Sequence, residues 1–139
     1  PKDMLLQFLK YHHTVNISAN VPSQLACVTA MKGPQDCVEE MKEAYQKRRD
    51  LLIERLNDIP GVPCMIPKGA FYAFPSVKVT GMTSEEFAER LLEEELVAVI
   101  PGTAFGGGGE GHVRISYATA LEKIELALER MQHFMQRHG

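Results

Sequence analysis

The residue best suited by type and position to bind an anion is Arg114, just after a run of glycines. The segment 112–117 (HVRISY) alternates strictly between polar and apolar residues, the pattern of a strand with one buried face. Val113, Ile115 and Tyr117 then share one face, and His112, Arg114 and Ser116 share the other. A guanidinium is a planar fork of donors that matches a carboxylate or a phosphate with two hydrogen bonds. From the spacing alone, an arginine on the solvated face of a half-covered sheet is the favoured interpretation, and an anion-binding strand is the alternative.

The glycine run Gly106–Gly111 formally satisfies the pattern GxGxxG. A phosphate cradle of that type needs a strand before the loop and a helix N-terminus after it. Because a strand is expected to follow here, dinucleotide binding is disfavoured. We expect a mobile surface loop, whose glycines let the domain approach a ligand closely.

The remaining reactive side chains form no recognisable catalytic or metal-binding set. The pairs His12–His13 and His133–His138 have spacings that do not converge on one helix face, and no serine lies in a GxSxG context. The odd number of cysteines (Cys27, Cys37 and Cys64) and the lack of a CxxC pair indicate reduced thiols in a cytosol-like compartment. We expect neither a metal site nor a hydrolase site.

Composition and charge argue against nucleic acid and membranes as partners. The chain has 139 residues, 45% of them hydrophobic, and a net charge of −3. That length suits one domain with a real core, and the charge gives no basic field to attract nucleic acid or an anionic membrane. No apolar run approaches the length of a membrane span. We expect neither partner.

Apolar periodicity and caps predict five helices. We expect them at 4–11, at 22–31 with an end at Gly33, from Pro34 to about Ile59, from the cap Thr83 to about Glu94, and from the cap Thr119 onward. Residues 12–20 are expected to be irregular. Both caps are followed three residues later by glutamate (Glu86 and Glu122), which is the capping-box pattern.

Strands are expected at 62–66, 69–75 and 96–100, in addition to the strand that carries Arg114. Together with the helices they predict an α+β fold of two layers, in which helices cover one face of a small, mainly antiparallel sheet. In segment 69–75, Phe71 and Ala73 point one way, whereas Tyr72 and Phe74 point the other. The face away from the helices should therefore expose an aromatic patch.

Three blocks of this sequence resemble class I/II, fold-type I aminotransferases that depend on pyridoxal phosphate. Segments 99–106 (VIPGTAFG) and 109–118 (GEGHVRISYA) are similar to the family's PG-x-x-FG and RxS(Y/F)A region near the C-terminus. Segment 69–75 (GAFYAFP) resembles its GAFY strand, and 20–26 (NVPSQLA) resembles the stretch after its cofactor lysine. The blocks occur in the family's order, so the resemblance covers essentially the whole chain.

The resemblance implies an aspartate aminotransferase-like architecture. Residues 34–139 would be the C-terminal small domain, and residues 1–33 would continue from a large domain outside this chain. Arg114 occupies the position of the family's arginine that grips the substrate α-carboxylate. The parent protein would be a cytoplasmic homodimer of amino acid metabolism that uses pyridoxal 5′-phosphate to transfer an amino group between an α-amino acid and a 2-oxo acid.

The family's cofactor residues have no counterpart in this chain. None of its lysines has the family's S-x-x-K context, so we expect no catalytic residue, no cofactor-binding residue and no activity in the isolated piece. The start at Pro1 without an initiator methionine also suggests a piece of a longer protein. A lyase or synthase of the same family, a stand-alone module that binds amino acids or carboxylates without catalysis, and an inert scaffold stay open as alternatives.

Overall fold

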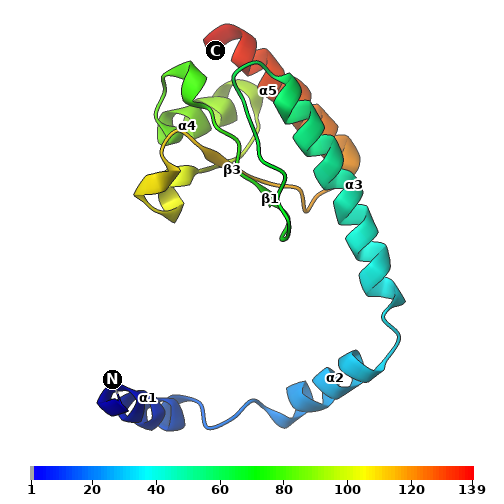
Figure 1. Cartoon of the computed structure of the whole chain (residues 1–139), viewed down its shortest axis with the longest axis vertical. Helices are drawn as coiled ribbons and strands as arrows, with labels where there is room; N and C mark the ends of the chain where they lie inside the picture. Colours follow the sequence, from blue (N-terminus) through cyan, green and yellow to red (C-terminus); the bar gives the residue numbers. More distant parts are fainter. Residues whose placement is uncertain (1) are drawn as a thin grey trace. The chain divides into compact units, whose positions relative to one another are not determined.

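A computed structural model describes residues 2–139. The chain forms two compact units, one up to Glu39 and one from Glu40 to Gly139 (Figure 1). Each unit is described by itself.

The first unit consists of helices that bury none of their side chains within residues 2–39. Helix α1 spans Lys2–Val15 and α2 spans Val21–Lys32. Asn20 caps α2, since its Oδ1 accepts a hydrogen bond of 2.8 Å from the Ser23 N–H. The prediction for α2, with its end at Gly33, is confirmed.

Two predicted boundaries in this region were wrong. Helix α1 continues through His12 and His13 to Val15, where an irregular segment was expected. No helix breaker stands between Tyr11 and Val15, and Thr14 is accommodated by donating to the Lys10 carbonyl. Helix α3 begins at Asp36, because the Gln35 carbonyl accepts the first helical hydrogen bonds; Pro34 lies outside the helix.

The second unit contains the sheet and three helices. Helix α3 (Asp36–Asp58) continues into it, and α4 (Ser84–Glu95) and α5 (Leu121–His138) follow. Three short 3₁₀ helices lie between them: η1 (Lys78–Thr80), η2 (Gly102–Phe105) and η3 (Gly107–Gly109). The predicted cap of α4 is confirmed, since Thr83 Oγ1 accepts a hydrogen bond of 3.2 Å from the Glu86 N–H.

The sheet is small and antiparallel, in the order β1–β3–β2. Strand β1 is Tyr72–Ala73, β2 is Ile100–Pro101 and β3 is Val113–Ser116. Tyr72 lies opposite Ser116, and Ile100 lies opposite Arg114. With helices beside this sheet, the α+β expectation is confirmed (Figure 1).

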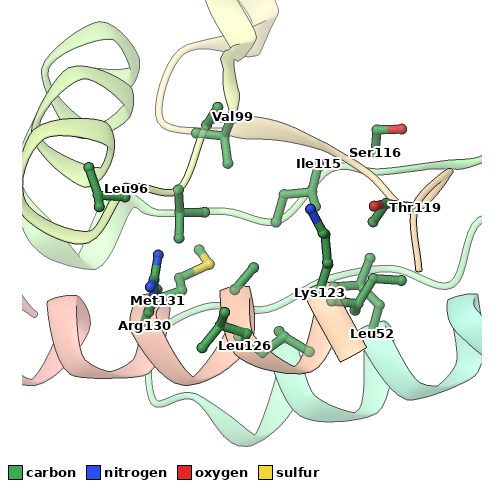
Figure 2. A pocket seen from close by; sticks show the side chains of 15 residues that line it. Leu52, Leu96, Val99, Ile115, Ser116, Thr119, Lys123, Leu126, Arg130 and Met131 are labelled. Atoms are coloured by element: carbon green, nitrogen blue, oxygen red, sulfur yellow. The ribbon is translucent and has the colours of Figure 1, made fainter. Parts of the chain in front are cut away.

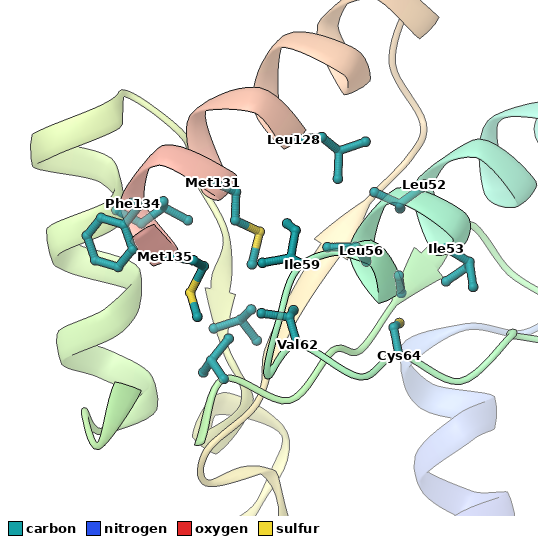
Figure 3. Packing of buried hydrophobic residues seen from close by; sticks show 14 of the residues in the cluster. Leu52, Ile53, Leu56, Ile59, Val62, Cys64, Leu128, Met131, Phe134 and Met135 are labelled. Carbon is teal, nitrogen blue, oxygen red and sulfur yellow. The ribbon is translucent and has the colours of Figure 1, made fainter. Parts of the chain in front are cut away.

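A single apolar core lies between the helices and one face of the sheet. Helices α3 and α5 supply Leu52, Leu56, Leu128 and Met131, as Figure 3 shows. The other members of the core include Phe87 and Leu91 of α4, Phe134 of α5, Ala73 and Val113 of the sheet, and Tyr117, which follows β3. The predicted stripe of α3 is buried only in its C-terminal part, since Val38 and Met41 are half exposed.

Three predicted strands are shorter than expected or absent. Segment 62–66 is not a strand: Asn57 Nδ2 donates to the Cys64 carbonyl and Asn57 Oδ1 accepts from the Cys64 N–H, so a side chain takes the place of a neighbouring strand. In segment 96–100, Leu96 adopts a left-handed conformation (φ 57°), and only Ile100 and Pro101 pair with β3. In segment 69–75 only Tyr72–Ala73 form a regular strand. The Phe71 and Pro75 carbonyls on either side still accept hydrogen bonds from the Tyr117 and Val113 N–H groups.

The predicted cap of the last helix was also wrong. Helix α5 starts at Leu121, so Ala120 takes the cap position that was expected for Thr119. The Ala120 side chain cannot cap, yet its carbonyl accepts from the Lys123 and Ile124 N–H groups. The apolar stripe of this helix (Ile124, Leu128, Met131 and Met135) is buried as expected, whereas Leu121 is 38% exposed. The extended backbone of Ala120 (ψ 147°) places the start of the helix one residue later than predicted.

Candidate functional site

The sheet has one covered face and one open face, and Arg114 lies on the open one. Pairing of β1 with β3 runs in one register from Phe71 opposite Tyr117 to Ser76 opposite His112. Tyr72, Phe74 and Ser76 consequently share a face with His112, Arg114 and Ser116. The face predicted for Arg114 from the sequence alternation is confirmed by this register.

Two aromatic rings hold the Arg114 guanidinium. Its Cζ lies 4.3 Å from the ring centroid of Tyr72 and 4.5 Å from that of Phe105. A cation that contacts two ring faces is attracted to both and restricted in its orientation. Tyr72 comes from β1, beside Arg114 in the sheet, whereas Phe105 comes from the end of η2.

Arg114 keeps hydrogen-bonding capacity that the described chain does not use. Its Nε is buried and has no hydrogen-bond partner among residues 2–139, and no carboxylate of these residues forms an ion pair with its guanidinium. A buried donor without a partner costs about 1–3 kcal/mol. Because Nε is covered by the protein, a carboxylate or phosphate would pair with the two terminal nitrogens of the guanidinium, which can donate two parallel hydrogen bonds.

Further aromatic side chains surround this arginine. Phe74 stacks on His112 with centroids 5.4 Å apart and planes 8° apart, and the Phe74 and Phe105 rings meet edge to face at 6.3 Å. Phe74 is 40% exposed and Phe105 53% exposed. We call Tyr72, Phe74, Phe105, His112 and Arg114 the arginine cluster. The exposed aromatic patch predicted for this face is confirmed.

Ser116 lies on the same face but at the margin of the cluster. It is exposed, and its Oγ accepts a hydrogen bond of 3.3 Å from the Ala118 N–H. His112 is half buried, and its Nδ1 lies 3.1 Å from the Glu110 carbonyl oxygen. Of the three polar residues on the predicted face, only Arg114 has a side chain without a hydrogen-bond partner among residues 2–139.

The middle of the glycine-rich loop, Gly106–Gly108, is exposed, as expected of a surface loop, whereas its two ends are packed. Its amides bond internally: the Gly106 N–H donates to Thr103, and the Gly109 N–H donates to Gly106. Gly102 and Gly109 are buried against each other, so that a Cβ on Gly102 would lie 2.1 Å from the Gly109 carbonyl oxygen. The loop leads into β3 rather than a helix, so it does not have the form of a dinucleotide cradle, as expected.

The N-terminus of α4 holds this loop in place. Glu110 Oε1 accepts hydrogen bonds from the Ser84 N–H at 2.8 Å and the Gly111 N–H at 3.1 Å. The bond from the Ser84 N–H, supported by that from Gly111, lowers the pKa of Glu110 against an opposing effect of desolvation. Thr103 Oγ1 also donates to Glu85 Oε1 at 3.2 Å. These bonds fix the segment that carries Phe105.

A second hollow lies apart from the arginine cluster. This groove of about 510 Å³ is bordered by α5, by Ile115 and by segment 96–99 (Figure 2). Its lining is mostly apolar. Of its two cationic residues, Lys123 and Arg130, the second donates to the Glu95 carbonyl at 3.1 Å.

Residues 2–139 contain neither a cluster of metal ligands nor a membrane-spanning helix. No group of three or more histidine, cysteine or acidic side chains in that range could hold a metal ion. No helix in the same range is both long and apolar enough to cross a membrane.

Sequence reasoning identified Arg114 but missed the two rings that hold it. The alternation placed Tyr72 on the correct face without relating it to Arg114. Phe105 lies nine residues before Arg114 in a non-repetitive loop, so no periodicity relates the two. The only signal for Phe105 was its place within the family-like block 99–106.

Comparison with known proteins agrees with this architecture. The family model for aminotransferase class I and II matches residues 2–131. The aspartate aminotransferase of Pyrococcus horikoshii is 46% identical over 136 residues, which cover 95% of this chain and 34% of that protein. The aromatic-amino-acid aminotransferase 2 of Thermococcus litoralis is 45% identical over 132 residues, covering 94% and 33%.

A solved structure shows the same fold. The aromatic aminotransferase of Pyrococcus horikoshii superposes with a TM-score of 0.79 and 51% identity, over 82% of this chain and 31% of that one. The chain thus spans about a third of the length of the curated relatives it matches. Because the family model covers nearly all of the sequence, this chain belongs to the class I and II aminotransferase family.

Proposed function

We propose that residues 34–139 are the C-terminal small domain of an aminotransferase that uses pyridoxal 5′-phosphate. We further propose that Arg114 binds the α-carboxylate of the substrate. Residues 1–33 would continue from the large domain of the same protein. The observation that carries the proposal is the Arg114 guanidinium, held between two rings and lacking a carboxylate partner among residues 2–139. The relatives' names support transfer of an amino group between an amino acid and a 2-oxo acid.

The arginine cluster is suited to orienting a substrate. Two parallel hydrogen bonds from a guanidinium fix both the position and the plane of a carboxylate, which a single point charge does not do. Transamination requires the bond from Cα to hydrogen to be aligned for proton removal, so a fixed carboxylate contributes directly to the rate. The neighbouring rings lower the local exposure to water, which strengthens the ion pair.

The cofactor itself does not fit the arginine cluster. Pyridoxal phosphate supplies an electron sink when bound, but a lysine must hold it covalently, and the cluster contains none. We therefore assign these residues to the substrate alone, and the catalytic and cofactor residues to the part of the protein outside this chain. On this proposal the isolated chain has no transaminase activity, and the complete protein is a cytoplasmic homodimer.

The test uses the full-length gene product that contains this chain. Transamination is measured with L-aspartate or L-phenylalanine as donor and 2-oxoglutarate as acceptor, in the native protein and in Arg114→Ala. Loss of the charge-assisted pair with the substrate carboxylate should weaken transition-state binding by about 2–5 kcal/mol, and kcat/KM should fall accordingly. Unchanged kcat/KM in Arg114→Ala would reject the assignment. A native gene product that binds amino acids through Arg114 but transfers no amino group would favour a binding module.

A further inference from the structure

The position of Phe105 over Arg114 depends on a loop that is folded back on itself. Phe105 ends η2, and Gly106 follows with φ 116°, a conformation that favours glycine. The two ends of the loop meet where Gly102 and Gly109 contact through their backbones. The position of Phe105 therefore depends on the contacts that hold the two ends of this loop in place.

The anchor of the loop is Glu110, together with Ser84. Glu110 Oε1 accepts from the Ser84 N–H at the start of α4 and from the Gly111 N–H within the loop. Ser84 is fully buried, and its Oγ donates to the Gly109 carbonyl at 3.3 Å and accepts from the His112 N–H at 3.2 Å. A carboxylate at a helix N-terminus is also favoured by the helix dipole. Glu110 thus joins α4 to the loop, and Ser84 joins α4 to His112, just before β3.

We infer that Glu110 is a positioning residue for substrate carboxylate binding, because it fixes the Gly102–Gly109 loop and thereby holds the Phe105 ring on the guanidinium of Arg114. This inference rests on the proposed function of Arg114. Glu110 itself touches neither substrate nor reacting atoms. Its effect on the reaction passes through the contact of 4.5 Å between Phe105 and Arg114.

The experiment is a double-mutant cycle in the full-length protein, with kcat and KM measured for L-aspartate or L-phenylalanine and 2-oxoglutarate. Glu110→Ala should lower kcat/KM about 10- to 100-fold, mainly through KM, since a small displacement of an orienting group has effects of this size. Glu110→Gln should stay within about threefold of the native value, because its amide oxygen still accepts from both N–H groups. Glu89→Ala, which removes an exposed carboxylate from helix α4, is the control.

Non-additivity separates positioning from general structural damage. If Glu110 acts through Phe105, the double variant Glu110→Ala/Phe105→Ala has the kcat/KM of Phe105→Ala alone. Additive losses, or a native kcat/KM in Glu110→Ala, would overturn the inference. If Glu110→Ala does not fold, Glu110→Asp, which shortens the anchor, is combined with Phe105→Leu under the same criteria.

The two proposals fail in different ways. If Arg114→Ala leaves kcat/KM unchanged, the proposed function is wrong and the inference falls with it. If Arg114→Ala lowers kcat/KM while Glu110→Ala and Glu110→Asp match the native protein, only the role of Glu110 is wrong.

Discussion

Replacement of Arg114 by lysine tests the geometry of the site separately from its charge. Lysine keeps a positive charge at the same place on β3, but its ammonium is a point donor without the planar fork. The guanidinium is sandwiched at 4.3 Å and 4.5 Å between the rings of Tyr72 and Phe105 and presents its donors in a fixed plane. The Arg114→Lys variant would therefore lose the second parallel hydrogen bond to the carboxylate and the stacking of a flat group on two rings.

The expected magnitude follows from these two losses. One hydrogen bond to a charged group contributes about 1.5–3 kcal/mol. Weaker contact with the rings removes about 0.5–1 kcal/mol more. A total of about 2–4 kcal/mol corresponds to a fall in kcat/KM of about 30- to 900-fold in Arg114→Lys.

The assay is steady-state transamination by the full-length protein with the donors named above. Arg48→Lys is the matched control, because Arg48 is another arginine over a ring, with its Cζ 5.4 Å from the centroid of Tyr45, but on helix α3. We expect it to leave kcat/KM unchanged. If Arg114→Lys retained the native kcat/KM, the bidentate, stacked geometry would be irrelevant, and the reasoning from the arginine cluster would be refuted.

Three further predictions concern the domain that carries the site. Leu56→Ala removes a fully buried core side chain and should lower the free energy of unfolding by about 2–5 kcal/mol in a denaturant titration, whereas Leu126→Ala, at a half-exposed position, should have little effect. Gly102→Ala places a Cβ against the Gly109 carbonyl and should raise the substrate KM; a native KM would show that the loop tolerates the change. The bond to His138, followed by those to Arg90 and Arg137, lowers the pKa of Glu94 from 4.5 to about 2, so the carboxylate stabilises the fold above pH 4.5 and this contribution is lost as the pH falls toward 2. Glu94→Gln should therefore be less stable at neutral pH and show a flatter decline in this range; an unchanged pH profile would contradict that role.

Local pattern predicted the parts of the site that depend on one segment. The alternation in β3 gave the face of Arg114, and the Thr83 cap gave the start of α4, because each depends on residues within a few positions. The two-sided aromatic segment at 69–75 likewise indicated that one face of the sheet would stay open.

The features that were predicted wrongly or missed depend on contacts that no sequence periodicity reveals. The Asn57 amide takes the place of a strand partner for Cys64, seven residues away, and no strand pattern reveals this substitution. Helix α5 starts at Leu121, one residue later than the capping-box pattern predicted, because Ala120 keeps an extended backbone. The glycine-rich loop was expected from its own residues alone, and its tie to helix α4 through Ser84 and Glu110, which are 26 residues apart, was not predicted.

Recognition of the substrate carboxylate by Arg114 can be probed by deleting that carboxylate from the substrate. In the full-length protein, kcat/KM for L-phenylalanine is compared with that for 2-phenylethylamine, in the native enzyme and in Arg114→Ala. We predict that the native enzyme strongly prefers the amino acid and that Arg114→Ala loses most of this preference, because the charge that reads the carboxylate is gone. An equal preference in both proteins would contradict this role of Arg114 and place carboxylate recognition elsewhere.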